Sequence, residues 1–292
     1  MASAMAVRGM AWITRNFHGL PGRWRLVRWL DNHETDLAAL PPQTVRFGSD
    51  YRMRVNPVDE NGRRVFVHGF EASERLTRHF VRLLRANDCV LDIGANVGYY
   101  TMVAAKLVGP GGCVHAFEAS PKTFRWLNAN ARLNPAADIH VHDKAVTDEC
   151  GEVTFHTAKE ACTGYSSIRD LGDGTGSVAR VPSVSIDSIL DELPPVRLVK
   201  IDVEGAELLV LRGMTGLIKR DQPFIIFEID DEFCHDLGYS AQALCDFLAQ
   251  RGYDLHRIIA RGDLEPVNGT PHERSNILAC PRTSEGLAAG RG

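Results

Sequence analysis

The chain has 292 residues, of which 44% are hydrophobic, and it carries 33 Lys and Arg against 37 Asp and Glu. This length suits one catalytic domain with additions, and the composition excludes a disordered chain. The formal net charge of −4 gives no reason to expect a nucleic acid as a partner. No apolar run reaches the ~18 residues that span a bilayer, and we expect no signal peptide at the N-terminus.

The cysteines are scattered along the sequence and never occur as Cys-x-x-Cys. They are Cys89, Cys113, Cys150, Cys162, Cys234, Cys245 and Cys280. An odd number without paired spacing indicates neither a disulfide framework nor a zinc site. A reducing cytoplasm is therefore the simplest compartment.

The first 30 residues are basic and aromatic. They contain five arginines and no acid, and the arginines are interleaved with Trp12, Phe17, Trp24 and Trp29. We interpret residues 1–43 as a helical N-terminal extension. The simpler interpretation is a helix packed on the domain with a solvated basic face. The alternative is a peripheral contact with an anionic membrane surface.

Residues 44–282 are predicted to form the main domain. Two β-prone stretches within 45–67 flank the sequence Asp-Glu-Asn-Gly at 59–62, whose Asn-Gly ending predicts a tight hairpin turn. Apolar residues then recur at helical spacing over 73–85, which predicts a helix covering one face of a sheet.

Short apolar strands alternate with helical segments through the predicted core, 88–230. The expected strands are 89–93, 113–117, 139–142, 198–201 and 223–229. This alternation predicts an α/β fold with a doubly wound, mostly parallel sheet.

The segment 151–185 interrupts the alternation because it is rich in Thr, Ser, Gly and Val and contains a glycine-rich run at 172–176. It is either a β-hairpin or loop insertion near the site, or a surface excursion without function. The tail 283–292 is small and polar, and we expect it to be flexible.

A glycine turn joins the first core strand to a helix in the sequence Asp92-Ile-Gly-Ala-Asn-Val-Gly98. Strand, glycine turn and helix is the order that a nucleoside site requires. We expect Gly94 to let the backbone approach a ligand and Gly98 to let the helix pack on the strand. The spacing lacks the extra glycine used at a dinucleotide pyrophosphate, which disfavours NAD or FAD. Asp92, Gly94, Asn96 and Gly98 are the predicted cofactor-binding residues of this turn.

Two further acids end the next strands. Glu118 follows Gly94 at close to the ~20-residue offset at which a carboxylate accepts from both ribose hydroxyls. Asp143 closes the following strand, where a carboxylate can accept from the adenine amino group. A solvated loop acid is the alternative for Asp143.

An acidic cluster follows the fourth core strand. Lys200, Asp202 and Glu204 fall on one side of an extended segment because side chains alternate with period two. Ligands bind beyond the carboxyl ends of such strands, so we predict catalytic or substrate-positioning roles for these three residues. The alternative is a strand-capping Lys200–Glu204 ion pair, with Glu207 stabilising the first turn of a helix.

Glu228 ends the fifth strand at the same edge and can join this cluster. Three carboxylates there can hold a divalent ion, but no ligand spacing supports one, so we predict no metal. Among the histidines, His235 lies nearest the expected site and is kept as a candidate base.

These residues resemble the FkbM family of class I S-adenosylmethionine-dependent methyltransferases over about 70–229. The resemblance rests on 90–101, Phe117-Glu118, Asn128, 184–187 and above all Lys200-Ile-Asp-Val-Glu-Gly-Ala-Glu207. It implies a Rossmann-like, seven-stranded fold, S-adenosylmethionine as methyl donor, and a hydroxyl acceptor on a sugar, glycolipid or secondary metabolite. Similar proteins often have proline after the acid, where this chain has Ala119-Ser120.

Two other functions fit parts of the pattern. One is a noncatalytic protein that binds S-adenosylmethionine or a nucleoside for regulation. The other is a nucleic-acid methyltransferase, which is expected to show an Asn/Asp-Pro-Pro-aromatic motif after the fourth strand or a basic platform. The sequence Asp-Val-Glu-Gly stands at that place instead, at 202–205.

Overall fold

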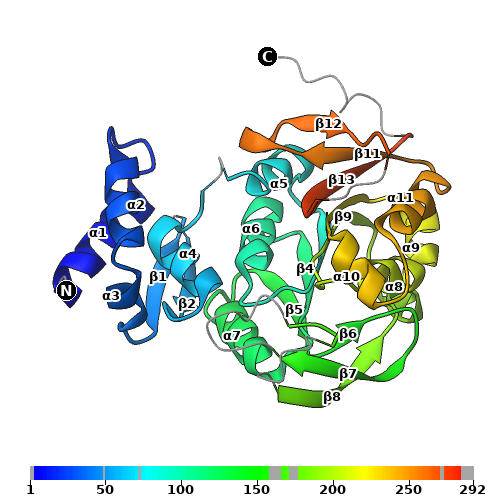
Figure 1. The fold of residues 1–292 in the computed structure, drawn as a ribbon, viewed down its shortest axis with the longest axis horizontal. Helices are drawn as coiled ribbons and strands as arrows, with labels where there is room; N and C mark the ends of the chain where they lie inside the picture. The colour runs from blue at the N-terminus through cyan, green and yellow to red at the C-terminus, as the bar shows by residue number, and fades with distance from the viewer. Residues whose placement is uncertain are drawn as a thin grey trace.

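The computed structural model of the protein describes residues 3–48, 50–71, 74–157, 166–170, 177–269 and 273–283. Its central element is a large sheet with helices on both faces (Figure 1). The strands are β3 (Cys89–Ile93), β4 (Cys113–Phe117), β5 (Asp138–His142), β9 (Val196–Ile201), β10 (Phe224–Ile229), β11 (Tyr253–Ile258), β12 (Leu264–Pro266) and β13 (Ser275–Pro281). Among the described residues their order is β12-β11-β13-β10-β9-β3-β4-β5.

The sheet is mostly parallel, as predicted. Strands β5, β4, β3, β9 and β10 run parallel, whereas β13, β11 and β12 are joined by antiparallel pairings. The expected doubly wound α/β fold is confirmed. The sheet has one strand more than the seven expected, because the short β12 pairs with β11 at the edge.

Two apolar cores lie on the two faces of this sheet. Neighbouring residues of β9 illustrate the division, because Leu198 faces one core and Val199 the other. Helices α5 (Thr77–Leu83) and α6 (Tyr99–Val108) contribute to the first core. The second core is covered by α8 (Glu207–Arg212), α9 (Thr215–Asp221), α10 (Asp231–Asp236) and α11 (Ala241–Ala249). The remaining helical segments of this part are α7 (Pro121–Arg132), η2 (Ile186–Glu192) and η3 (Ala260–Gly262).

The N-terminal part of the chain forms a helical lobe beside the sheet domain (Figure 1). It consists of α1 (Ala4–Asn16), α2 (Arg23–Asp31) and α3 (Glu34–Ala38), followed by β1 (Gln43–Phe47), β2 (Tyr51–Val55) and α4 (Glu60–His68). Helix α1 packs on α4, and the Thr14 hydroxyl donates to the Val67 carbonyl oxygen at 2.8 Å. No helix within the described ranges is long and apolar enough to cross a membrane.

The predicted hairpin over 45–67 is wrong in its turn position. The hairpin is formed by β1 and β2, and the chain reverses between Phe47 and Tyr51. The sequence at 59–62 instead begins α4, because the Asp59 side chain caps the helix by accepting from the Gly62 N–H at 2.8 Å. Gly62 is small for a packing reason, since a Cβ there would lie 2.2 Å from the Asn56 carbonyl oxygen.

A second sheet is formed by β6 (Ala145–Val146), β7 (Gly151–Thr157) and β8 (Ser177–Val184), in the order β6-β8-β7. Strands β7 and β8 pair antiparallel, so the predicted insertion at 151–185 contains a β-hairpin. The glycine-rich run 172–176 lies outside the described residues, as do Cys162 and the tail from residue 284.

Strand register brings together two cysteines that the sequence shows as scattered. Cys89 and Cys113 are paired across the parallel strands β3 and β4. With His115 they form a group whose possible metal-ligand atoms all lie within 4.8 Å of one another. Residues far apart in sequence become neighbours in a parallel sheet, so cysteine spacing does not report this grouping, and the prediction of no zinc site stays a prediction.

Candidate active site

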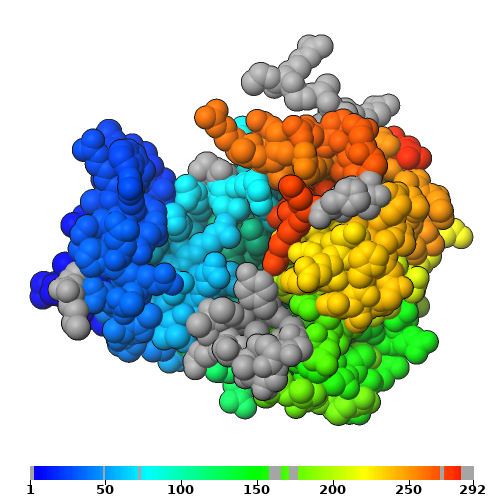
Figure 2. Space-filling model, viewed as in Figure 1, coloured from blue at the N-terminus to red at the C-terminus, as the bar shows by residue number. Residues whose placement is uncertain are grey.

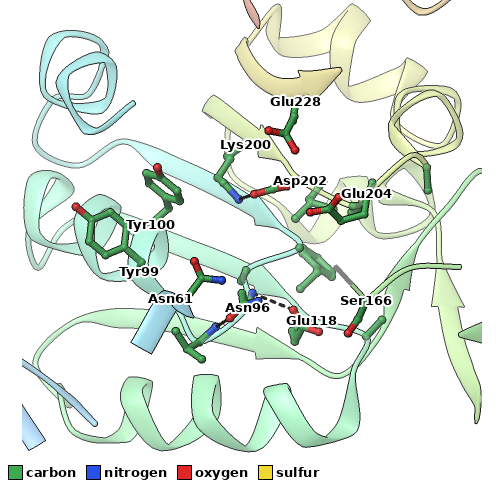
Figure 3. Close-up of a pocket in the computed structure, with 18 of the residues that line it drawn as sticks. Asn61, Asn96, Tyr99, Tyr100, Glu118, Ser166, Lys200, Asp202, Glu204 and Glu228 are labelled. Atoms are coloured by element: carbon green, nitrogen blue, oxygen red, sulfur yellow. Dashed lines mark hydrogen bonds and ion pairs between the residues drawn. The ribbon is translucent and has the colours of Figure 1, made fainter. Parts of the chain in front are cut away.

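A cavity of about 490 Å³ opens at the carboxyl ends of β3, β4, β9 and β10. Its volume falls within the usual ~300–1,000 Å³ range of small-molecule sites. Six of the predicted site residues line it, and Figure 3 shows five of these by label. The six are Gly94, Asn96, Glu118, Lys200, Asp202 and Glu204.

Gly94 lines the cavity and also allows two backbone turns to touch, while its predicted approach to a ligand stays a prediction. Its φ is +75°, and a Cβ there would lie 1.9 Å from the Asp202 carbonyl oxygen. The Asp202 N–H also donates to the Ile93 carbonyl oxygen at 3.0 Å. The turn after β3 is therefore held directly against the loop after β9.

Gly98 begins α6 with a φ of +94°, a conformation that favours glycine. A Cβ at this position would lie 2.9 Å from Leu127 Cδ1 of α7. The predicted close packing is real, but the neighbour is a helix and not the preceding strand.

Glu118 is held by backbone donors on both oxygens. Oε1 accepts from the Ser120 N–H at 2.8 Å, and Oε2 accepts from the Asn96 N–H at 2.9 Å (Figure 3). Burial raises the pKa of Glu118 to about 7, although these two hydrogen bonds act in the opposite direction. Each carboxylate oxygen keeps capacity for a second donor, so a fixed acceptor pair is presented at the cavity.

Lys200 lines the cavity and joins two carboxylates. Its Nζ lies 3.2 Å from Asp202 Oδ2 and 3.7 Å from Asp92 Oδ1, and its side chain is 3% exposed. Burial lowers the pKa of Lys200, but attraction by Asp202 and Asp92 outweighs it and the net pKa is raised. The ammonium therefore stays charged, and it fixes the orientation of Asp202.

Asp92 is fully buried and does not line the cavity. Its Oδ2 accepts from the Thr101 hydroxyl at 2.6 Å, which ties the end of β3 to α6. Burial raises the pKa of Asp92, with Lys200 opposing the shift. The structure thus places Asp92 behind the site, where it supports Lys200.

An arginine occupies the centre of the acidic cluster. Arg274 Nη2 lies 3.0 and 3.2 Å from the two oxygens of Glu204, and it also pairs with Glu228. Ligand oxygens of Asp202, Glu204 and Glu228 lie within 4.8 Å of one another. The guanidinium supplies the positive charge that such a group of carboxylates requires. The ion pair considered in the sequence between Lys200 and Glu204 is not formed, because each has another partner.

Burial raises the pKa of Glu204 to about 8, repulsion by Asp202 adds to the shift, and Arg274 opposes it. Glu204 also adopts a positive φ of 52° in the loop after β9. Burial likewise raises the pKa of Glu228. At neutral pH Glu204 therefore holds a proton in part of the population. Asp202 is the most exposed of the three carboxylates at 39%.

Three other candidates lie away from the cavity lining. Glu207 is buried and accepts from the N–H groups of Val203 and Gly205, so it stabilises the loop that leads into α8. His235 is exposed and pairs with Asp231 at 3.5 Å. Asp143 is exposed directly after β5 and does not reach the cavity. The predicted roles of Asp143 and His235 stay predictions without support from this geometry.

The cavity also contains residues that the sequence did not indicate. Asn61 comes from α4 and lies near the Asn96 turn, while Tyr99 and Tyr100 come from the start of α6 (Figure 3). Arg274 comes from the segment before β13. Two local signals lie near these residues: the capping Asp59 before α4, and the stretch 90–101, which includes Tyr99 and Tyr100.

Comparison with known proteins agrees with this arrangement of strands and turns. The family model of the methyltransferase FkbM domain matches residues 92–255, more than half of the chain. The chain belongs to the FkbM methyltransferase family. It is therefore a methyltransferase, and the resemblance seen in the sequence is confirmed.

Relatives of this FkbM-family protein include two named enzymes. The hexuronic acid methyltransferase AglP of Haloferax volcanii is 27% identical over 180 residues, which cover 61% of this chain and 70% of that protein. The 31-O-demethyl-FK506 methyltransferase FkbM of Streptomyces tacrolimicus is 34% identical over 170 residues, covering 47% of this chain and 63% of that protein. The chain thus spans about two thirds of the length of these curated relatives.

Among solved structures, the methyltransferase FkbM from Methylobacillus flagellatus is similar to this FkbM-family chain with 18% identity and a TM-score of 0.44. The match covers 68% of this chain and 45% of that one.

Proposed function

We propose that this protein transfers a methyl group from S-adenosylmethionine to a hydroxyl oxygen of a sugar, a glycolipid or a secondary metabolite. The observation that carries the proposal is one cavity with two different ends (Figure 3). Glu118 stands at one end, and the carboxylates around Asp202 stand at the other. By their names, the two relatives act on a hexuronic acid and on 31-O-demethyl-FK506.

The residues at the first end fit the nucleoside part of S-adenosylmethionine. Glu118 is fixed by the Asn96 and Ser120 N–H groups, so it can accept from two ribose hydroxyls without first being ordered. Gly94 and Gly98 shape the turn around it, and Asp92 supports the turn from behind. When bound, S-adenosylmethionine supplies an electrophilic methyl group on a sulfonium.

At the other end, we propose Asp202 as the group that receives the hydroxyl proton. It is the most exposed carboxylate of the cluster, and Lys200 holds its Oδ2 at 3.2 Å. As the acceptor oxygen takes the methyl group, its proton passes to the Asp202 carboxylate. A general base of this kind contributes typically about 10²- to 10⁴-fold to the rate.

We assign Lys200 and Glu204 roles in positioning the reacting groups. Lys200 is a positioning residue, because its buried ammonium remains charged and acts through Asp202. Glu204 is anchored by Arg274 and faces the cavity, so it can orient the acceptor hydroxyl. With a pKa of about 8 it can donate as well as accept a hydrogen bond.

Calorimetric titration with S-adenosylmethionine and S-adenosylhomocysteine tests the cofactor assignment. We expect binding by the parent and a loss of at least about tenfold in Glu118→Ala. A folded parent that binds neither compound would overturn the proposal. Equal affinities in the parent and Glu118→Ala would remove Glu118 from the site.

The acceptor class is tested by methyl transfer to a panel of uronic acids, neutral sugars and hydroxylated macrolides. Asp202→Asn keeps the size of the side chain and removes its charge. We expect it to lower turnover by about 10²- to 10⁴-fold while S-adenosylmethionine affinity changes little. Unchanged turnover in this variant would exclude Asp202 as the proton acceptor.

A further inference from the structure

Exposed apolar side chains concentrate in the N-terminal lobe. Eight large hydrophobic residues are exposed in the part of the chain that the structure describes, and five of them lie between residues 5 and 24. They are Met5, Trp12, Phe17, Leu20 and Trp24, with exposures of 84, 53, 49, 41 and 61%. Such a concentration marks an interaction surface more than scattered single residues do.

Helix α1 has two opposite faces. Its buried residues Val7, Ala11 and Thr14 face the rest of the lobe, where α1 packs on α4. Met5 and Trp12 lie seven residues apart, two helical turns, so they share the opposite face, and both are exposed. The inner face is therefore already used for packing, and the outer face is available for a partner.

The arginines of α1 and α2 divide in the same way. Arg15 donates to the Phe66 carbonyl oxygen, and Arg23 donates to the Thr14 carbonyl oxygen and pairs with Glu71. These two hold α1 and α2 together and against the segment from α4 to Glu71.

The other three arginines, Arg8, Arg25 and Arg28, are exposed. Among α1 and α2 the acid is Asp31 at the end of α2, which is exposed, so three exposed arginines outnumber one exposed carboxylate on these two helices.

We propose that α1, α2 and the turn between them dock the protein on an anionic lipid bilayer. The combination of exposed Trp, Phe and Leu with Arg is the composition of segments that lie in the membrane interface. Indole rings favour that interface because one edge is apolar and the N–H is polar. The lobe forms one flank of the molecule, where a flat surface can reach it (Figure 2).

The contacts inside the lobe agree with this role. The rings of Trp12 and Phe17 meet edge to face at 5.5 Å between centroids, so they form one apolar projection. The Arg25 guanidinium lies 5.4 Å from the Trp24 ring centroid, which places positive charge beside an exposed indole. Insertion of the rings and attraction of phosphate groups would therefore occur together.

Co-sedimentation with vesicles tests the proposal. The probes are vesicles of phosphatidylcholine alone and of phosphatidylcholine mixed with phosphatidylglycerol. We expect binding to the mixed vesicles and a blue shift of tryptophan fluorescence on binding. Each arginine near an anionic surface contributes about fivefold, so the combined change Arg8→Gln, Arg25→Gln and Arg28→Gln should weaken binding about 10²-fold.

The apolar contribution is tested with Trp12→Ser and Trp24→Ser, which should each weaken vesicle binding. Val178→Ser is the matched control, because Val178 is 62% exposed but lies on β8, outside the lobe. Unchanged thermal melting would show that the variants fold. Binding of the cofactor plays no part in this assay, so its result is independent of the proposed function.

Three results would overturn the proposal. One is a folded parent that stays in the supernatant with both kinds of vesicle. Another is vesicle binding that the arginine changes leave intact. The third is self-association, seen by sedimentation velocity and abolished by Trp12→Ser, without vesicle binding, which would make this surface an interface between copies of the chain.

Discussion

Substitution of Gly94 by alanine tests whether the two turns that build the cavity touch as described. The residue has a φ of +75°, which costs an alanine about 1–2 kcal/mol. The new Cβ would lie 1.9 Å from the Asp202 carbonyl oxygen, so the turns must separate until this contact exceeds 3.0 Å. Forced separation of packed groups costs about 1–3 kcal/mol more. We therefore expect Gly94→Ala to lower the free energy of unfolding by about 2–5 kcal/mol.

Gly22→Ala is the matched control. Gly22 precedes α2 and has a similar φ of +78° in the left-handed region, but nothing lies within 4 Å of a Cβ built there. We expect a loss of only about 1–2 kcal/mol in this variant. In thermal melts this corresponds to a fall in Tm of about 2–4 °C, against about 4–10 °C for Gly94→Ala.

The two variants should also differ in ligand binding, because separation of the turns moves Asn96 away from Glu118. S-adenosylmethionine affinity is expected to fall in Gly94→Ala and to stay at the parent value in Gly22→Ala. Equal losses of stability in the two variants would refute the close contact between the turns.

Two further predictions concern charge in the cavity. Because burial raises the pKa of Glu118 to about 7, acidification from pH 8 to pH 6 protonates the carboxylate. S-adenosylmethionine affinity should then fall by up to about tenfold per pH unit below pH 7. If the affinity of Glu118→Gln depends on pH as steeply as that of the parent, the effect belongs to another group. Arg274→Met leaves Glu204 and Glu228 without their shared cation and should lower the free energy of unfolding by about 1–3 kcal/mol in urea titrations. Arg274→Lys should recover part of this loss, and full stability in Arg274→Met would show that the pairing contributes nothing.

Much of the site could be predicted from the sequence, because the motifs that form it are local. Three segments each combine a strand, its end and a turn within a few residues. They are the glycine turn after Asp92, the acid at the end of the next strand, and the sequence from Lys200 to Glu207. The carboxyl ends of parallel strands meet at one edge of a sheet, so these separate segments could be predicted to face one crevice. The structure places Glu118 and Asp202 in that one cavity.

A local sequence pattern leads to a wrong prediction where the same residues suit two kinds of local structure. The sequence at 59–62 suits a hairpin turn, but it also suits a helix start, because aspartate is a good N-cap. Two tertiary contacts favour the helix. Gly62 lies against the Asn56 carbonyl oxygen, and α4 packs against α1. Tertiary packing overrides a turn preference of this kind.

The sequence by itself determined the fold class, the family and the two acidic ends of the cavity, because hydrophobic periodicity and short motifs report on neighbours along the chain. Only the tertiary structure decided that Arg274 pairs with Glu204, that Asp202 presses against Gly94, and that Asp143 stays outside the cavity. Each of these depends on strand order and loop path between distant segments. Such contacts follow from how the elements pack together, and no spacing along one segment encodes them.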